Sequence, residues 1–484
     1  MTEIRTLLRG KLPTTWMSFP GDPDFDRARA TWNIRNRYRP LGIVRPTSVQ
    51  EIRTVLDCVR GSADARVVAR SGGHSFEGLS LGGEDDKALV IDMVKFNEIE
   101  IRSDEQVAIV GGGVLLGDLY REAFNQGGFM VPAGSCVAVG IGGQLQCGGY
   151  GHYSRTAGIL TDQILQVEIV TADGELRVAD KNTNPDLFWA IRGNGTGSFG
   201  IITQAKIKLT KAPRAVARFS YKWKRSDIDF AEHFTLLQNY ALSMPRTANP
   251  WICIWLGEVE FVGAVLTDTE TDRDAVLADL EAALPPSTDK QVEAVTFLES
   301  VRDFGLTQTS APWYSDLNAI EREHDEHLRY MTIRAGFITE PLNAECINHL
   351  AEVVARQPLT GSRIQLVSLN PDDGPLLAAT AIPVRGATWA MGMSSWFELA
   401  DFPDEDSLIQ AGRANDIWLN EAYNVFRPYS AGGYIGDDDM AENATSEDIS
   451  TAYWGNHLAR LSELKRKYDP ANLFHHKLSI PPNC

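Results

Sequence analysis

The stretch that decides the fold is Arg70-Ser71-Gly72-Gly73-His74-Ser75, which directly follows the apolar run Val67-Val68-Ala69. Two adjacent glycines let the backbone approach a ligand closely, and their N–H groups can form a concave site for an anion such as a pyrophosphate. His74 stands where that backbone would present it to the ligand. A simple turn histidine is the other interpretation, because a glycine pair on its own is common in turns.

More glycine-rich motifs follow, at Ala133-Gly134-Ser135-Cys136, Val139-Gly140-Ile141-Gly142-Gly143 and Gly148-Gly149-Tyr150-Gly151. A further run, Gly195-Thr196-Gly197-Ser198-Phe199-Gly200, has the spacing of a dinucleotide fingerprint. The residues after it, Ile201–Leu209, alternate like a strand, whereas the fingerprint requires a helix there. A nicotinamide cofactor is therefore rejected.

Composition places the chain among ordinary globular proteins, with 43% hydrophobic and 23% charged residues in a length of 484. The formal net charge of −18 disfavours nucleic acid or an anionic membrane as a partner. The six cysteines are scattered without metal-ligand spacing, so we expect no metal site. Because neither a secretory signal nor an 18-residue apolar run occurs, we expect a cytoplasmic protein with no membrane partner.

Strand and helix patterns predict an α+β fold in two domains, with a boundary near Pro213. Residues 1–212 form the first domain, and residues 213–428 form a second one with an antiparallel sheet backed by helices. Strands are expected at 219–224, 251–256, 331–337, 364–369 and 388–397, and helices at 272–284, 343–356 and 407–424.

The last segment, residues 429–484, is expected to pack back on the first domain. Its first part, Ala431–Asp439, looks like a strand flanked by glycines. Further on, five apolar side chains share one face of a predicted helix that stops at Asp469-Pro470: Trp454, Leu458, Leu461, Leu464 and Tyr468.

Five motifs, taken together and in this order, resemble the berberine-bridge-enzyme-like branch of the FAD-linked, vanillyl-alcohol-oxidase-type oxidases. Three are the glycine-rich stretches already quoted around His74, Cys136 and Tyr150. The other two are Asp186-Leu-Phe-Trp189-Ala-Ile-Arg-Gly193 and Tyr468-Asp-Pro-Ala-Asn472-Leu-Phe474. The resemblance, from about residue 38 to the C-terminus, implies a two-subdomain FAD-binding domain of the PCMH type and an antiparallel substrate domain.

The resemblance also implies that His74 carries FAD through its 8α-methyl carbon and that Cys136 bonds the flavin C6 carbon. A neutral imidazole and a thiolate are suitable nucleophiles for the electron-poor flavin ring. A small buried cysteine is the alternative for Cys136, and Cys147 is interpreted as packing. The residues expected to bind the cofactor are His74, Cys136, Arg70, Ser71, Gly72, Gly73, Ser75, Gly134, Ser135, Val139, Gly140, Gly142, Gly143, Gly149, Gly151, Gly200, Ile202, Tyr434 and Asn472.

The catalytic residues expected from the resemblance are Tyr150, Tyr434 and Asp437. Family members often carry Tyr-x-Asn-Tyr near the C-terminus, but this chain reads Tyr434-Ile435-Gly436-Asp437, so the second tyrosine is missing. Asp437 is the candidate replacement, because Asp437 and Asp439 would share one face of a strand and raise each other's pKa. A solvated acidic loop is the alternative.

Trp389 and Met391 share a strand face, as does Gln365 with Val367, and these side chains are candidates for a substrate pocket or for core. The expected activity is oxidation of an alcohol or hemiacetal carbon of a sugar, glycoside or secondary metabolite, with hydride passing to flavin N5 and O₂ reduced to H₂O₂. The alternatives are an oxidative cyclase or amine oxidase on the same scaffold, and a flavin-loaded binding protein. A monomer or homodimer is expected.

Overall fold

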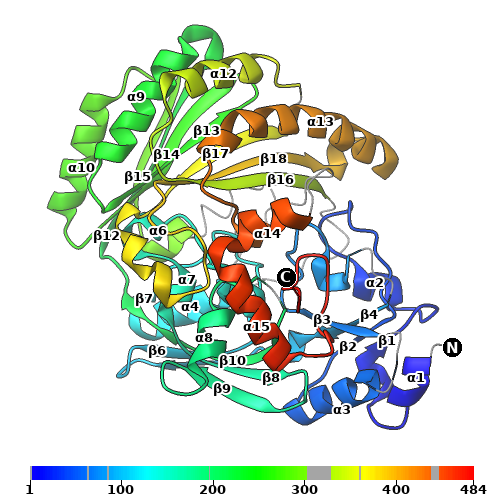
Figure 1. The fold of residues 1–484 in the computed structure, drawn as a ribbon. Helices are drawn as coiled ribbons and strands as arrows, with labels where there is room; N and C mark the ends of the chain where they lie inside the picture. The colour runs from blue at the N-terminus through cyan, green and yellow to red at the C-terminus, as the bar shows by residue number, and fades with distance from the viewer. Residues whose placement is uncertain are drawn as a thin grey trace.

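The computed structural model describes residues 3–60, 62, 65–83, 87–195, 197–301, 329–358, 361–437 and 446–483. In this part of the chain, three sheets and a two-stranded ribbon are packed with helices into an α+β structure (Figure 1), as predicted. Among these residues no helix combines the length and the apolar character needed to cross a bilayer.

The N-terminal sheet has four strands in the order β1-β2-β4-β3, and β2, β4 and β3 run parallel. Helix α3 packs on this sheet because Ile52, Val55 and Val59 share a buried face against Val67 and Leu89. The strands and helices of this layer are β1 (Met17–Ser18), β2 (Gly42–Val44), β3 (Arg66–Arg70), β4 (Ala88–Asp92), α1 (Glu3–Leu8), α2 (Phe25–Arg29) and α3 (Val49–Arg60).

A second, antiparallel sheet has the order β5-β6-β10-β8-β9. Its strands are β5 (Ile99–Arg102), β6 (Val107–Gly111), β8 (Ile164–Thr171), β9 (Leu176–Asp180) and β10 (Gly200–Lys208). Its helices are α4 (Leu116–Gly127), α5 (Ile141–Cys147), α6 (Ser154–Ala157), α7 (Leu160–Gln163) and α8 (Pro185–Ile191), and a ribbon pairs β7 (Phe129–Met130) with β11 (Thr210–Lys211).

The third sheet is fully antiparallel, with the order β15-β12-β14-β13-β17-β18-β16, and helices cover one of its faces (Figure 1). Its strands are β12 (Ala215–Lys224), β13 (Ala248–Trp255), β14 (Glu258–Thr267), β15 (Asp289–Val295), β16 (Arg329–Ile338), β17 (Ser362–Ser368) and β18 (Trp389–Glu398). The helices are α9 (Phe230–Ser243), α10 (Glu270–Ala283), α12 (Ala344–Ala355) and α13 (Glu405–Phe426), so the predicted helix-backed sheet is confirmed.

The C-terminal segment runs back along the first two sheets through α14 (Ser446–Trp454) and α15 (Leu458–Tyr468) (Figure 1). Behind α15, the Val67 N–H donates to the Leu473 carbonyl at 3.0 Å, next to a bridge between Val67 and Phe474. The expected strand at 431–439 is wrong for Ile435–Asp437, which form a 3-10 turn, η9. Asp438 and Asp439 lie outside the described residues.

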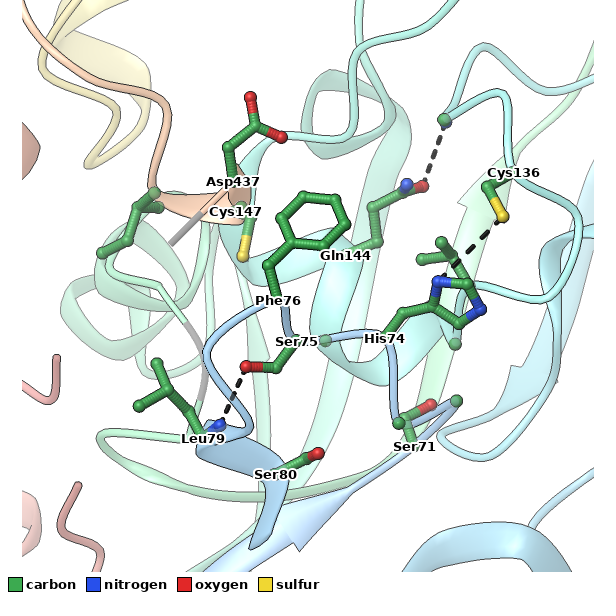
Figure 2. Close-up of a pocket in the computed structure, with 18 of the residues that line it drawn as sticks. Ser71, His74, Ser75, Phe76, Leu79, Ser80, Cys136, Gln144, Cys147 and Asp437 are labelled. Atoms are coloured by element: carbon green, nitrogen blue, oxygen red, sulfur yellow. Dashed lines mark hydrogen bonds between the residues drawn. The ribbon is translucent and has the colours of Figure 1, made fainter. Parts of the chain in front are cut away.

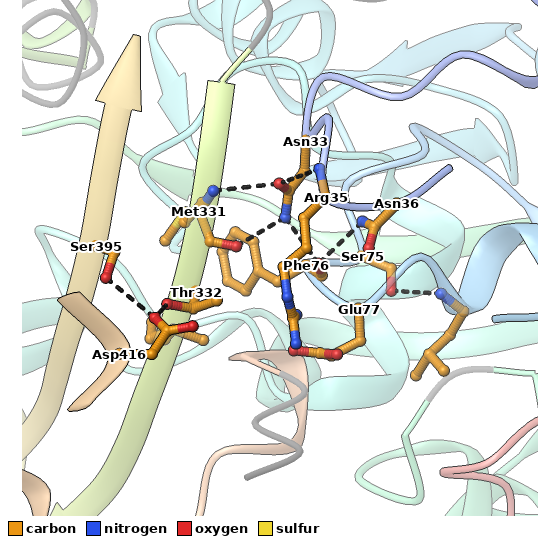
Figure 3. A network of polar contacts seen from close by, with 12 residues as sticks. Asn33, Arg35, Asn36, Ser75, Phe76, Glu77, Met331, Thr332, Ser395 and Asp416 are labelled. Carbon is orange, nitrogen blue, oxygen red and sulfur yellow. Dashed lines mark hydrogen bonds and ion pairs between the residues drawn. The ribbon is translucent and has the colours of Figure 1, made fainter. Parts of the chain in front are cut away.

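Asn33 joins the third sheet to the loop after β3 (Figure 3). Its side-chain amide donates to the carbonyls of Phe76 and Met331, both at 2.9 Å, and its oxygen accepts from the Met331 N–H at 3.1 Å. Met331 lies on β16, and Phe76 lies two residues after His74. The buried Asn33 side chain therefore fixes the distance between β16 and the loop that carries His74.

Candidate active site

The loop after β3 and the loop before α5 meet at His74 and Cys136, which are 62 residues apart in the chain. Figure 2 shows the two side chains pointing toward each other, with 4.0 Å between His74 Nδ1 and Cys136 Sγ. Glycine backbone surrounds them, and Gln144 supports the Cys136 loop because its Oε1 accepts from the Gly134 N–H at 3.1 Å. Two nucleophiles of different chemistry are therefore presented from neighbouring loops.

The His74 imidazole is neutral. Burial is the main cause that lowers the pKa of His74 to about 3, and the Arg329 guanidinium adds to this effect. The ring lies against Trp32, with 5.5 Å between ring centroids and an interplanar angle of 29°. His74 Nε2 is buried without a hydrogen-bond partner among the described residues. The ring thus keeps a lone pair available for bond formation at neutral pH.

A cavity of about 260 Å³ opens between these loops and the uncovered face of the third sheet. It brings together most of the residues expected to bind the cofactor: His74, Cys136, Ser71, Gly72, Gly73, Ser75, Gly134, Ser135, Val139, Gly140, Gly142, Gly143, Gly200, Ile202 and Tyr434. Four others do not line it. Arg70 pairs instead with Asp92 at 2.6 Å, and Gly149, Gly151 and Asn472 are not among the residues that line the cavity.

Tyr150, Tyr434 and Asp437 form a contact group at the cavity wall. The Tyr150 hydroxyl donates to Asp437 Oδ2 at 3.2 Å, and the Tyr434 hydroxyl accepts from the Gly149 N–H at 3.0 Å. The two tyrosine rings meet edge to face with centroids 4.6 Å apart. Asp437 is only 8% exposed and lines the cavity, so the alternative of a solvated loop does not hold at this residue.

Both tyrosines in this group are protonated at neutral pH. Burial, followed by the Asp437 charge and the neighbouring Tyr434, raises the pKa of Tyr150 well above its usual value of 10. Burial also raises the pKa of Tyr434. Tyr150 is therefore a hydrogen-bond donor toward Asp437, and the carboxyl group is the natural end point for a proton that enters this group.

The third sheet forms the opposite wall of the cavity. On each strand, alternate residues point toward the cavity. Gln365 and Val367 on β17 face the cavity, as do Gly392, Ser394 and Trp396 on β18. Trp389 and Met391 have the other parity and are fully buried against the helices, so the interpretation of these two residues as pocket lining is wrong.

Several cavity residues were not identified from the sequence. Trp396 and Ser394 could have been found by testing both faces of the predicted strand, because they alternate with Trp389 and Met391. Trp32, Trp251, Arg363 and His476 lie in no glycine motif and become recognisable only when the sheets are assembled. Cys147 lines the cavity as well as packing in the core.

These residues fit FAD. The floor of the cavity is backbone at Gly72, Gly73, Gly140 and Gly142, which suits a pyrophosphate and a flat ring system. The buried Nε2 of His74 has no hydrogen-bond partner within the described part of the chain, so the imidazole has bonding capacity that these residues do not use. A second cavity, beside Cys147 and Tyr434, has only about 40 Å³ and is too small for such a group.

Comparisons with known proteins agree with this assignment. Residues 40–180 match the FAD binding domain family, and residues 435–481 match the family described as berberine and berberine like. An FAD-linked oxidoreductase of Metarhizium anisopliae is 27% identical over 472 residues, which cover 95% of this chain and 88% of the relative. A xylooligosaccharide oxidase of Thermothelomyces thermophilus is 24% identical over 468 residues, with coverage of 93% and 89%.

Among solved structures, BBE-like 1 of Physcomitrella patens superimposes with a TM-score of 0.86 at 25% identity over 100% of both chains. The similarity therefore includes all three sheets and the returning C-terminal segment. This chain is an FAD-linked oxidoreductase that carries an FAD binding domain and a berberine-like C-terminal segment, and it is similar over its whole length to berberine-bridge-enzyme-like proteins.

Proposed function

We propose that the protein is an oxidase that holds FAD by two covalent bonds and oxidises an alcohol or hemiacetal carbon of a sugar, glycoside or secondary metabolite, reducing O₂ to H₂O₂. The observation that carries the proposal is the 4.0 Å approach of His74 Nδ1 to Cys136 Sγ at the glycine-lined floor of the cavity. When bound, FAD supplies a two-electron acceptor at N5 and passes the electrons to O₂.

The two attachments use the 8α-methyl carbon for His74 and the C6 carbon for Cys136. Each bond replaces one hydrogen on the flavin carbon and one on the residue, and the two electrons released are taken by O₂. The neutral state of His74 supports this role, since a protonated imidazole has no lone pair to donate. His74 and Cys136 would hold the flavin from two neighbouring loops, because their side chains lie close together.

Substrate activation is assigned to Tyr150 and Asp437. Because Tyr150 is protonated and donates to Asp437, the substrate hydroxyl would donate to the Tyr150 oxygen while the Tyr150 proton moves to Asp437. Tyr434 acts as a positioning residue, since its ring contacts Tyr150 and its hydroxyl is held by the Gly149 N–H. A xylooligosaccharide oxidase among the relatives supports a sugar or glycoside as substrate.

The test is a panel of sugars, glycosides and alcohols mixed anaerobically with the holoenzyme. We expect at least one compound to bleach the flavin absorbance, and to give a lactone, ketone or aldehyde with one equivalent of H₂O₂ when O₂ is admitted. A product with a new carbon–carbon or carbon–nitrogen bond would instead support the cyclase or amine oxidase alternative. A flavin that no compound bleaches would favour a binding protein.

A further inference from the structure

Arg363, on β17, is a buried cation in the cavity wall. Its side chain is almost entirely covered, with the residue 4% exposed, and its Nε donates to Ser394 Oγ at 2.8 Å. The guanidinium lies over the Trp396 ring, 4.5 Å from the centroid. Within the described ranges no carboxylate pairs with Arg363, so its two terminal nitrogens have no anionic partner there.

A second arginine beside the same tryptophan is paired, and it shows what Arg363 lacks. Arg329 lies 5.3 Å from the Trp396 centroid, but its Nε is 2.8 Å from a carboxylate oxygen of Glu398. A buried charge is stable only when it is compensated. Among the described residues Glu398 pairs with Arg329 and not with Arg363, which leaves the Arg363 charge for a ligand. The protein has a net charge of −18, so a buried positive charge that no described carboxylate pairs with is unusual in this chain.

The groups around Arg363 do not neutralise it. Burial lowers the pKa of Arg363 to about 10, with a small contribution from Arg329, so the guanidinium remains charged at neutral pH. The neighbouring Cys253 is a neutral thiol, because burial and the charge of Glu260 raise its pKa. Glu260 itself accepts hydrogen bonds from Ser220 and Trp255 on the same sheet.

We propose that Arg363 binds a carboxylate of the substrate, so that the molecule oxidised in this cavity is an organic acid. This inference rests on the proposed function, because it takes the cavity to be the substrate site. The planar guanidinium suits a carboxylate, which it can bind through two parallel hydrogen bonds. Gln365, two residues further along the same strand face, adds an amide beside the carboxylate, and Trp396 and Trp251 offer flat surfaces for the rest of the molecule.

The cofactor does not provide the missing anion. The glycine-rich loops that suit a pyrophosphate are in the first two sheets, whereas Arg363 belongs to the third. Arg363 contacts Trp396, which lies 5.7 Å from Trp32, and Trp32 stacks on His74. This end of the cavity would hold the dimethylbenzene ring of a flavin carried by His74, and that ring has no anionic group.

The position of Arg363 also indicates the length of the substrate. Val367, four residues along β17, belongs to the apolar cluster that Tyr150 and Tyr434 pack against. Four residues of a strand span about 13 Å. A substrate that reaches both Arg363 and Tyr150 is therefore elongated, with its acid group at one end and the oxidised carbon toward the other.

The test uses sodium benzoate as an aromatic carboxylate and benzamide as its neutral counterpart, each titrated into holoenzyme. Binding is measured from the flavin difference spectrum and from the shift in thermal midpoint, neither of which requires turnover. We expect benzoate to bind and benzamide to bind about 10- to 100-fold more weakly. Arg363→Met should lose this preference and Arg363→Lys should keep part of it.

The matched control is Arg356→Met, which removes the same charge from an exposed side chain paired with Glu421. It should leave benzoate binding unchanged. Equal binding of benzoate and benzamide to the unaltered holoenzyme would overturn the proposal, even if Arg363→Met failed to fold. So would a neutral sugar oxidised with the same kcat/KM by Arg363→Met and the unaltered enzyme, although the oxidase assignment would then stand.

Discussion

Gly72 and Gly140 lie in direct backbone contact, and neither position has room for a side chain. A Cβ at Gly72 would collide with the Gly140 amide nitrogen, and a Cβ at Gly140 would collide with the Gly72 nitrogen and with Ser71. Ser71 Oγ also donates to the Gly112 carbonyl at 2.6 Å. The loops that carry His74 and Cys136 are therefore joined into one rigid unit, which fixes the separation of the two nucleophiles.

Gly140→Ala should separate these loops and weaken flavin incorporation. Overpacking against backbone costs about 1–3 kcal/mol, because the backbone cannot move aside as a flexible side chain would. We expect a lower urea midpoint and a lower ratio of flavin to protein absorbance in the purified variant. Gly374→Ala is the control, since a Cβ there meets nothing within 4 Å. Equal flavin content in both variants would contradict the rigid-unit interpretation.

Acid-precipitated protein should remain yellow if two covalent bonds hold the flavin, as we propose. His74→Ala or Cys136→Ala alone should leave one bond and keep the flavin in the pellet, while the double variant should release all of it to the supernatant. Flavin fluorescence of denatured protein on a gel gives a second measurement. Complete release of FAD from His74→Ala would show that Cys136 is not an attachment point.

Asp437→Asn should lower kcat about 10²- to 10⁴-fold, the usual contribution of a general base. Because the pKa of Tyr150 is raised well above 10, its ionisation should produce no change in kcat below that pH. Steady-state kinetics of Asp437→Asn and of the unaltered enzyme, measured with the substrate that bleaches the flavin, check this prediction.

Tyr150→Phe should reduce kcat by a similar factor, and the double variant should be little worse than either single one, since both residues act on one proton. Tyr240→Phe is the matched control, because Tyr240 donates to Asp279 at 3.0 Å on the outer helices. A kcat of Asp437→Asn equal to that of the unaltered enzyme would assign the base to another group.

Local patterns predicted the elements well, because the strands and helices of the third sheet have clear alternation and clear amphipathic faces. Strand β3 ends at Arg70, one residue before the glycine pair Gly72-Gly73. The strand face that lines the cavity was harder to predict. Trp389 and Met391 were candidates for a substrate pocket or for core, and they pack under the helices, whereas Ser394 and Trp396 line the cavity.

Contacts between distant segments could not be predicted. No sequence motif marks Arg363. Its position becomes clear only when Trp396 and Ser394 from β18 are placed beside it. Asn33 has no motif, yet its side chain joins β16 to the His74 loop. The glycine-flanked stretch Ala431–Asp439 suggested a strand, but the backbone turns at Ile435–Asp437 so that Asp437 reaches Tyr150.

Lys465 should make a large contribution to the stability of the folded protein, because it connects the C-terminal segment to the FAD-binding sheets. Its ammonium group is fully buried and donates to Asp469 Oδ2 and to the carbonyls of Ser198 and Phe474, each at 2.7 Å. Lys465→Met leaves the buried Asp469 carboxylate without its cation, which should cost about 3–5 kcal/mol. Ser198 lies between Gly197 and Gly200, both in the cavity wall, so flavin content should also fall.

Lys467→Met provides the comparison, because Lys467 lies two residues away and pairs with Asp186 at 2.6 Å on the surface. Its side chain is 57% exposed, so its loss should cost less than about 1 kcal/mol. Urea denaturation of the two variants, followed by tryptophan fluorescence and by flavin absorbance, measures the difference. Equal midpoints would mean that the buried lysine does not hold the segment to the FAD-binding sheets.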